Sequence, residues 1–357
     1  MTTGILRLAN GIEVRENNDF SVDDFDHIPI LDISRMWSDD FEERKSLSTE
    51  LREVCSKVGF FYAKNHGVPK EIASGPFRQA RNFFSQPMEK KMEVYTGLLP
   101  ENCYYGYHPL AEYNMNGKKY NDLYEAFNFG YEFEEDPEKP TEKPDHYENS
   151  NMWPTGKGLE NFKKEIFDYH RHLLTLSRRL IRIMALALDL PEDYFDEAVK
   201  FPAAGMRLVH YPPQKVDADE QVGIGAHTDF ECFTLVNQDM VGGLEVLNKS
   251  GNWVKAPYIE DTFVVNVADC LMRLTNDTFV STVHRVVNNT SGTDRYSCPF
   301  FFGVDKRYVL NPLPTCVSSE KPAKYPVTTC GEYLAWRASL SKARRQKAKE
   351  LAEEKLK

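Results

Sequence analysis

Short apolar runs broken by glycine, proline and asparagine fill residues 206–304 of this 357-residue chain. Brief strands separated by such turn residues are typical of a sandwich or barrel of the jelly-roll type. The segment before it differs, because residues 158–190 carry apolar side chains at three- and four-residue steps, the spacing of a helix with one buried face. We therefore expect a mainly β fold with flanking helices, in which a double-stranded β-helix (jelly-roll) core follows an N-terminal α/β region.

The N-terminal region mixes strand and helix patterns. Residues 27–34 and 59–63 are predicted strands, and residues 41–58 are a predicted helix between them. A further helix is expected from about Pro76 to Gln86, with the proline in its first turn. The predicted divisions are an N-terminal α/β region with a lid (1–157), a backing helix (158–190), the jelly-roll core (205–314) and a C-terminal helical segment (315–357).

Two segments have weaker patterns. Residues 92–152 are rich in aromatic and polar side chains with little periodicity, which predicts either an irregular packed loop or a lid over a binding site. Residues 334–357 are rich in charges of both signs, so we expect a solvated terminal helix. A role of that helix in binding a partner has no support in the sequence.

Composition excludes several classes of partner. A net charge of −10 argues against nucleic acid, whose phosphates require a basic surface. No apolar run is long enough to span a membrane, and the first residues lack the basic and apolar parts of a secretory signal. The seven cysteines include no Cys-x-x-Cys pair, as expected of reduced thiols. We expect a cytoplasmic protein that binds a small molecule, with no obligate protein partner evident.

Two histidines and an aspartate form a candidate metal site. His227 and Asp229 are two residues apart, so on a strand their side chains share one face. His284 follows 57 residues after His227, so a later segment must fold back beside the first. Two imidazoles and one carboxylate suit non-haem Fe(II) with open coordination positions.

A second group of residues follows on an aromatic-rich predicted strand. Period two places Arg295, Ser297 and Phe301 on one face of that strand. A 2-oxo acid can occupy two of the open iron positions and O2 the last, which leaves the far carboxylate of the acid without a partner. Arginine binds a carboxylate bidentately and stays charged, and the serine hydroxyl can add a hydrogen bond.

The ordered combination is far more specific than any one part, and it resembles the Fe(II)- and 2-oxoglutarate-dependent dioxygenases of the isopenicillin N synthase-like family. The resemblance extends in order from about residue 28 to about residue 335. The matching stretches are Ile28-Pro-Ile-Leu-Asp-Ile33, Gly59-Phe-Phe-Tyr-Ala-Lys-Asn-His-Gly-Val68, Arg207-Leu-Val-His-Tyr-Pro-Pro213, Ala226-His-Thr-Asp229, Gly242-Gly-Leu-Glu-Val246, Val267-Ala-Asp-Cys-Leu271, Leu274-Thr-Asn-Asp277 and His284-Arg-Val286.

The resemblance implies a role for each matched site residue. It makes the two histidines and the aspartate iron ligands, and it makes Arg295 and Ser297 the clamp for the distal carboxylate of 2-oxoglutarate. Tyr211 stands where a tyrosine commonly helps to hold this co-substrate. One departure weakens that last inference, because Val209 occupies a position where many plant members have asparagine. A second departure, Ala268 where glycine is usual, is expected only to stiffen a turn.

The substrate-binding residues are less constrained by the pattern. Phe301 falls where some members of the family stack an aromatic ring on the substrate, and Tyr105 and Tyr107 lie in the predicted lid. Arg273 has two possible roles, binding an anionic substrate or forming a surface salt bridge. An aromatic pocket predicts a small, largely apolar or aromatic metabolite, such as a polyketide, terpenoid or alkaloid intermediate.

Several functions remain open at this point. The favoured one is oxidation of a substrate C–H bond coupled to conversion of 2-oxoglutarate into succinate and CO2, by hydroxylation, desaturation or ring formation. An isopenicillin N synthase-type oxidase would keep the iron but take electrons from the substrate itself. A non-catalytic metal-binding jelly roll and a zinc hydrolase could use the same three ligands, but neither needs a clamp for a dicarboxylate.

Overall fold

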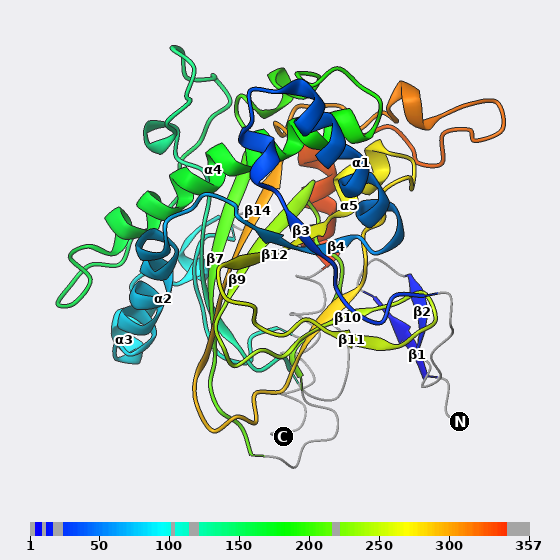
Figure 1. The fold of residues 1–357 in the computed structure, drawn as a ribbon. Helices are drawn as coiled ribbons and strands as arrows, with labels where there is room; N and C mark the ends of the chain where they lie inside the picture. The colour runs from blue at the N-terminus through cyan, green and yellow to red at the C-terminus, as the bar shows by residue number, and fades with distance from the viewer. Residues whose placement is uncertain are drawn as a thin grey trace.

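Two facing sheets, a terminal hairpin and a layer of helices make up the protein in the computed structural model (Figure 1). The structure describes residues 4–8, 12–16, 24–100, 104–113, 121–215 and 222–340. The hairpin consists of β1 (Gly4–Arg7) and β2 (Glu13–Glu16). Parts of the predicted lid, residues 101–103 and 114–120, lie outside the described residues, as do residues 341–357 of the predicted terminal helix.

Eight described strands form the large sheet, and all neighbours are antiparallel except β3 and β4. In spatial order the strands are β3 (Ile30–Asp32), β4 (Phe60–Lys64), β12 (Thr262–Val267), β9 (Phe233–Gln238), β14 (Arg295–Gly303), β7 (Ala203–Tyr211), β6 (Glu125–Phe129) and β5 (Gly106–His108). Strands of the N-terminal region thus extend the sheet at both edges of the central four. The division of the chain into separate regions stays a prediction.

The small sheet carries the two candidate histidine ligands. Its described strands, in spatial order, are β11 (Trp253–Lys255), β10 (Leu244–Leu247), β13 (His284–Val287) and β8 (Val222–His227). Strands β8 and β9 are consecutive in the chain but lie in different sheets, which is how a jelly roll crosses from one layer to the other. The sheets meet where the ring of Phe60 contacts that of His284, with centroids 5.3 Å apart. The predicted jelly-roll core is confirmed.

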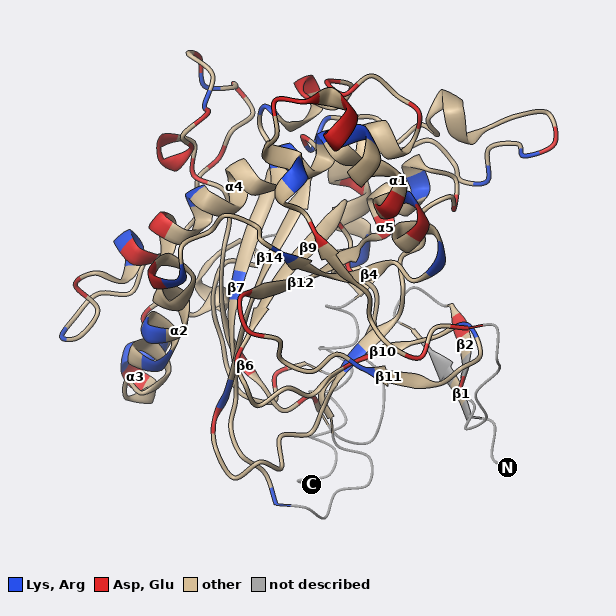
Figure 2. Ribbon diagram, in the orientation of Figure 1, with Lys and Arg blue, Asp and Glu red and all other residues tan. Residues whose placement is uncertain are grey.

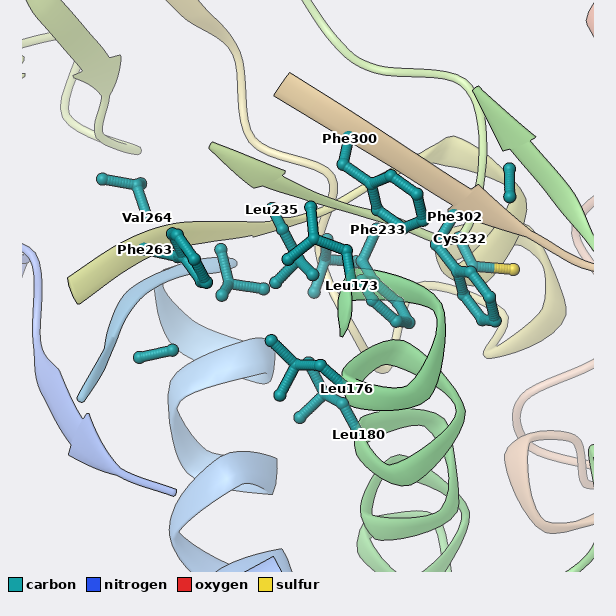
Figure 3. Packing of buried hydrophobic residues seen from close by; sticks show 14 of the residues in the cluster. Leu173, Leu176, Leu180, Cys232, Phe233, Leu235, Phe263, Val264, Phe300 and Phe302 are labelled. Carbon is teal, nitrogen blue, oxygen red and sulfur yellow. The ribbon is translucent and has the colours of Figure 1, made fainter. Parts of the chain in front are cut away.

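One face of strand β14 packs in the hydrophobic core under the helices. Its other face looks into the interior of the jelly roll, the space between the two sheets. Its register with β7 and β9 is regular, so alternate side chains face opposite sides. Phe300 and Phe302 face helix α4 (Phe162–Ala187): the ring of Phe300 lies 5.1 Å from that of His170, and Leu173 of the same helix points toward the sheet (Figure 3). Because Arg295, Ser297 and Phe301 alternate with these phenylalanines, they face the interior, as the two-residue period predicted.

Helices cover the outer face of the large sheet (Figure 1). They are α1 (Phe41–Lys57), α2 (Lys70–Phe84) and α4, while the short α3 (Met88–Met92) follows α2 and the short α5 (Asp269–Leu274) lies between β12 and β13 in the chain. Helix α1 begins where the Asp40 carboxylate accepts a hydrogen bond from the Glu42 N–H at 2.9 Å, an N-cap contact. The predicted helices at 41–58 and 158–190 are confirmed.

The predicted start of α2 at Pro76 is wrong. The helix begins at Lys70, and the first intrahelical bond runs from the Ala73 N–H to the Pro69 carbonyl at 2.9 Å. Pro76 therefore lies inside the helix, where it removes one backbone donor. The helix persists because its buried face, which includes Phe83 and Phe84, packs against the sheet and α4.

The segment 92–152 contributes more regular structure than its sequence pattern predicted. Strands β5 and β6 pair with each other, and β6 pairs with β7, so this segment forms one edge of the large sheet. Short 3-10 turns complete the described elements, at Ser34–Trp37, Thr96–Leu98, Phe133–Glu135, Glu197–Val199 and Pro314–Cys316.

The described part of the C-terminal helix is not simply solvated. Residues 331–340 are helical, and within them Tyr333 is 7 % exposed and Arg337 is 2 % exposed. Acidic and basic side chains otherwise concentrate on the helices and loops, while the strands of the large sheet carry few of them (Figure 2). No helix in the described part of the chain is long and apolar enough to cross a membrane.

Candidate metal and co-substrate site

Strand pairing closes the sequence gap between the candidate ligands. His284 opens β13 directly opposite His227, the last residue of β8. Asp229 lies beyond the end of β8 in the loop that leads to β9, so it does not share a strand with His227 as the spacing predicted. One ligand atom from each residue lies within 4.8 Å of the others, and each histidine Nε2 is 3.7 Å from Asp229 Oδ1. The structure therefore brings all three residues together.

Backbone carbonyls fix the orientation of both imidazole rings. Nδ1 of His227 lies 2.8 Å from the carbonyl oxygen of Gly225, and Nδ1 of His284 lies 3.2 Å from that of Thr282. A carbonyl can only accept a hydrogen bond, so each Nδ1 carries the proton and donates it. Each Nε2 then keeps its lone pair for a metal ion.

The carboxylate of Asp229 is held by one oxygen. Thr234 Oγ1 donates to Oδ2 at 2.5 Å, and Asn266 Nδ2 donates to the same oxygen at 2.8 Å. Both donors come from the interior face of the large sheet, on β9 and β12. Because Oδ2 is engaged, Oδ1 is the oxygen that faces the two histidines.

His227, Asp229 and His284 are together called the metal cluster below, and the negative charge of its carboxylate favours the binding of a cation. Burial, with a smaller effect of His284, lowers the pKa of His227 to about 3, so its imidazole is neutral at neutral pH. Burial opposes ionisation of Asp229, but the adjacent histidines and its two hydrogen bonds outweigh that effect and lower its pKa. A neutral imidazole at His227 and an ionised carboxylate at Asp229 are the forms that bind a divalent metal ion.

Arg295 is a buried cation with an unused donor. The side chain is 2 % exposed, its Nε donates to the carbonyl of Gly242, and the guanidinium carbon lies 4.5 Å from the centre of the Tyr211 ring. Gly242 and Gly243 form this turn with φ values of 77° and 96°, which favour glycine. Nη1 of Arg295 is buried and has no hydrogen-bond partner among the residues that the structure describes. A buried guanidinium with a free donor fits an anionic ligand such as a carboxylate.

Ser297 and Tyr211 lie beside this arginine. Ser297 is 4 % exposed and pairs with Val209 across β7, while Tyr211 pairs with Arg295. Burial raises the pKa of Tyr211, although the charge of Arg295 and a hydrogen bond with Ser297 oppose the rise. The phenol is therefore neutral at neutral pH, and a serine and a tyrosine hydroxyl flank the guanidinium.

Phe301 lies on the metal side of the large sheet. It pairs with Thr234 on β9, whose hydroxyl binds Asp229, and with Gly205 on β7. The side chain is only partly buried, unlike those of Phe300 and Phe302, which pack under the helices. The register therefore agrees with a position for Phe301 beside the metal cluster.

The structure places the two predicted lid tyrosines differently from each other. Tyr107 is fully buried among core residues, and its hydroxyl binds the Glu125 carboxylate at 2.5 Å. Its ring contacts Phe83 of α2, so it faces the helices and not the interior of the jelly roll. The hydroxyl of Tyr105 lies against Gly130, where a Cβ atom would stand 2.1 Å from the oxygen. A substrate contact of Tyr105 stays a prediction.

Arg273 forms no salt bridge among the described residues, and a contact with substrate stays a prediction. Its guanidinium lies over the rings of Tyr325 and Tyr333, 4.7 and 4.8 Å from their centroids, and Nη2 donates to the Pro326 carbonyl at 2.8 Å. Cation–π contacts with the C-terminal segment therefore account for its position.

One residue of the interior was missed as a site candidate. Arg207 shares the interior face of β7 with Tyr211, and its Nε donates to Asn128 Oδ1 at 2.8 Å. Its charge is near enough to help lower the pKa of His227. The sequence held a signal for this position, because Arg207 and Tyr211 are four residues apart on one strand and must share a face.

Comparison with known proteins agrees with this geometry. The family described as "non-haem dioxygenase in morphine synthesis N-terminal" matches residues 28–156, and the 2OG-Fe(II) oxygenase superfamily matches residues 202–304. The 2-oxoglutarate-Fe(II) type oxidoreductase ppzC of Metarhizium majus is 35% identical over 325 residues, which cover 87% of this chain and 86% of the relative. The oxidoreductase hxnY of Emericella nidulans, of the same type, is 35% identical over 337 residues, which cover 91% of this chain and 93% of the relative.

A solved structure shares the fold. It is that of a full-length Neurospora crassa protein in complex with α-ketoglutarate and thymine, and it superposes with a TM-score of 0.78 at 28% sequence identity. The match covers 87% of this chain and 96% of that chain.

The fold, the metal cluster and these similarities define the class. The chain belongs to the 2OG-Fe(II) oxygenase superfamily. It is a 2-oxoglutarate-dependent dioxygenase that uses Fe(II), 2-oxoglutarate and O2 to oxidise a small molecule.

Proposed function

We propose that His227, Asp229 and His284 hold the catalytic Fe(II), and that Arg295 and Ser297 bind the distal carboxylate of 2-oxoglutarate. The buried, unpartnered Nη1 of Arg295 carries the second part of this proposal, because an uncompensated guanidinium donor in the protein interior is costly without an anion. When bound, Fe(II) with 2-oxoglutarate supplies the oxidising power of O2 for attack on a substrate C–H bond, with release of succinate and CO2.

The residues of the chain orient the reactants and exclude water. The carbonyls of Gly225 and Thr282 hold the two imidazoles so that Nε2 of each points at the metal position. Arg295 and the neighbouring hydroxyls fix one end of the co-substrate, which leaves its other end directed toward the cluster. Phe60, fully buried against His284, closes one side of the site with an apolar ring.

We propose a substrate that is small and partly apolar and that carries an acceptor or anionic group. Phe301 provides a partly buried ring on one side of the cluster, and Arg207 provides a half-buried cation on the same sheet face. Its Nε donates to Asn128 and its guanidinium carbon lies 5.9 Å from the centre of the Tyr124 ring, and we propose that its terminal nitrogens bind the acceptor group of the substrate. An intermediate of secondary metabolism fits these requirements, with hydroxylation, desaturation and ring formation as possible outcomes.

The alternatives have less support. An oxidase independent of 2-oxoglutarate would also need iron, but the similar fungal proteins are named 2-oxoglutarate-Fe(II) oxidoreductases. If the protein were a zinc hydrolase or a non-catalytic metal-binding protein, the buried Arg295 would have no anionic ligand to bind. The net charge of −10 argues against nucleic acid as a partner, and we further propose a cytoplasmic protein without an obligate protein partner.

A turnover screen tests the proposal. The purified protein with Fe(II) and ascorbate is incubated with 2-oxoglutarate and a metabolite library, and succinate release and product mass are measured for each compound. We expect oxidation of a subset of small compounds that carry a carboxylate or carbonyl group, in equal amounts to succinate. Product formation without any 2-oxo acid would establish the oxidase alternative instead.

A further inference from the structure

The C-terminal helix docks beside the loop that holds Asp229. Residues 331–340 are helical and lie near α5, in red in Figure 1. Tyr333 and Arg337 are four residues apart and share one helix face, which is buried. The guanidinium carbon of Arg337 lies 4.2 Å from the centre of the Phe230 ring, one residue beyond Asp229. The helix also meets the predicted lid, because the Tyr104 hydroxyl donates to the Ala338 carbonyl at 2.6 Å.

Asp269 connects this helix to the metal cluster. Its carboxylate forms an ion pair with Arg337 and accepts a hydrogen bond from the Tyr333 hydroxyl at 2.8 Å. Its other oxygen accepts from Ser281 Oγ at 2.8 Å, three residues before His284. The backbone N–H of Asp269 donates to the carbonyl of Asp229 at 3.1 Å. One buried residue therefore contacts the segments that carry two of the three proposed ligands.

Arg337 also contacts the metal loop directly. Its Nη2 lies 3.3 Å from both the carbonyl oxygen and Oγ1 of Thr228, the residue between His227 and Asp229. Burial lowers the pKa of Arg337 to about 10, so the side chain is still a cation at neutral pH. Its planar fork reaches two partners in fixed directions, which a lysine ammonium would not reproduce.

The loop needs such support because it lies outside the sheets. His227 and His284 are held by the pairing of β8 with β13, whereas Asp229 has left β8 and has no ladder hydrogen bonds among the described strand pairs. Its backbone carbonyl is bound by Asp269 alone among the described backbone contacts. Displacement of Asp269 would therefore free the backbone of Asp229 and leave this ligand held only through its carboxylate, by Thr234 and Asn266.

We propose that Arg337 is a positioning residue for the metal site, which acts through Asp269 and Thr228 to hold Asp229 in ligating geometry. The C-terminal helix is then a functional part of the metal centre. This inference rests on the proposed role of Asp229 as a ligand.

The test measures metal binding without turnover. Co(II) is titrated into metal-free wild-type protein and Arg337→Met, with binding followed by calorimetry and by the visible d–d absorption of the ion, well below each melting temperature. Changes to residues that orient metal ligands typically cost about 10- to 100-fold in affinity. We expect Arg337→Met to bind Co(II) at least about tenfold more weakly and with a changed d–d spectrum.

A matched variant separates positioning from general stability. Arg178 on α4 forms a similarly buried bidentate pair with Asp136, at 2.7 Å for each hydrogen bond, and neither residue contacts the cluster in the described structure. Arg178→Met should lower the melting temperature and leave Co(II) affinity within about twofold of wild type. Arg337→Lys retains the charge but not the fork, so it should recover only part of the affinity and spectrum, and it replaces the methionine variant if that one does not fold.

The outcomes distinguish failure of the role proposed for Arg337 from failure of the proposed metal site. If both Arg337 variants melt lower yet bind Co(II) with wild-type affinity and spectrum, Arg337 is only a structural residue and the inference is wrong. If the wild-type protein itself binds no Co(II) or Fe(II), the proposed metal site fails, and with it this extension.

Discussion

At the scale of single residues, hydrogen bonds assign a separate task to each polar atom of the metal cluster. The Nδ1 atoms of His227 and His284 donate to backbone carbonyls, and Oδ2 of Asp229 accepts from Thr234 and Asn266. Two Nε2 atoms and one Oδ1 remain, and these are the atoms that converge. The sequence indicates the residue types, but only the structure shows which atom of each residue remains for the metal.

The first prediction concerns His284. His284→Ala removes one of three ligands from a site that must hold a divalent ion, so we expect loss of Fe(II) binding and of oxygen-dependent succinate formation. The site lies at the edge of the core, so circular dichroism should show a folded protein. Undiminished turnover in the folded variant would contradict the assignment of His284 as a ligand.

The second prediction concerns Arg295. Loss of a charge-assisted contact to a buried carboxylate costs on the order of 2–5 kcal/mol, so Arg295→Ala should raise the KM for 2-oxoglutarate by at least roughly tenfold. Arg295→Lys keeps the charge but not the bidentate fork, so its KM for 2-oxoglutarate should lie between those of wild type and Arg295→Ala. The measurement is succinate formation against 2-oxoglutarate concentration. An unchanged KM in both variants would show that the distal carboxylate binds elsewhere.

The third prediction concerns Phe301. If its ring contacts substrate, Phe301→Ala should weaken substrate binding and uncouple the reaction, so that succinate exceeds product. If the ring is only core packing, its loss should destabilise the fold by roughly 3–5 kcal/mol and leave coupling intact. The succinate-to-product ratio and the melting temperature, measured on one preparation, distinguish these cases.

At the scale of elements, the sequence predicted what local periodicity controls and missed what long-range contacts control. The two-residue period of β14 and the helical spacing of α4 act locally, and both were correct. Strands β5 and β6 were missed because β6 is held by pairing with β7, some 80 residues later, and β5 is held by pairing with β6. Arg337 looked like part of a solvated helix, since its partner Asp269 lies far away in the chain. The position of Asp229 beyond β8 depends on where that strand stops pairing, which spacing alone does not show.

The fourth prediction belongs to the contact between β6 and β7. His210 on β7 lies between two carboxylates, with Nδ1 2.7 Å from Glu125 Oε1 and Nε2 2.8 Å from Asp294 Oδ1. Burial disfavours its cation, but these two hydrogen bonds outweigh burial and raise the pKa of His210. The folded protein thus binds a proton more tightly than the unfolded chain does. The stabilisation that His210 contributes is fully present below the ordinary histidine pKa of about 6.5. It is lost as the pH rises through the raised pKa that His210 has in the folded protein.

Comparison with His210→Gln isolates this contribution from other titrating groups. Lys91 and Tyr107 also bind Glu125, so the variant keeps partners for that carboxylate. We expect wild type to exceed the variant in free energy of unfolding at pH 6, and the difference to shrink by pH 9. A difference that is constant or grows over this range in urea titrations would contradict the assigned charge state.

At the scale of the whole molecule, the bound metal and co-substrate would join the two sheets. The histidines belong to the small sheet, whereas Arg295 and Ser297 belong to the large sheet. The interior between them holds buried polar atoms that have no hydrogen-bond partner in the described part of the chain, namely Arg295 Nη1, Asn266 Oδ1 and Gln238 Oε1. Ligands that satisfy such groups bind the folded state and not the unfolded chain, so they stabilise the whole domain.

The fifth prediction follows from this linkage. A ligand at 100 times its Kd adds about 2.7 kcal/mol to the free energy of unfolding, which corresponds to a rise of several degrees in melting temperature. We expect Co(II) alone to raise the Tm of metal-free wild type, and 2-oxoglutarate to raise it further only after metal is present, because it is chelated by the ion. Arg295→Ala should retain the metal step and lose most of the 2-oxoglutarate step, whereas His284→Ala should lose both. A full 2-oxoglutarate step in the absence of metal would show that the co-substrate binds away from the cluster and that the two sheets are not joined in this way.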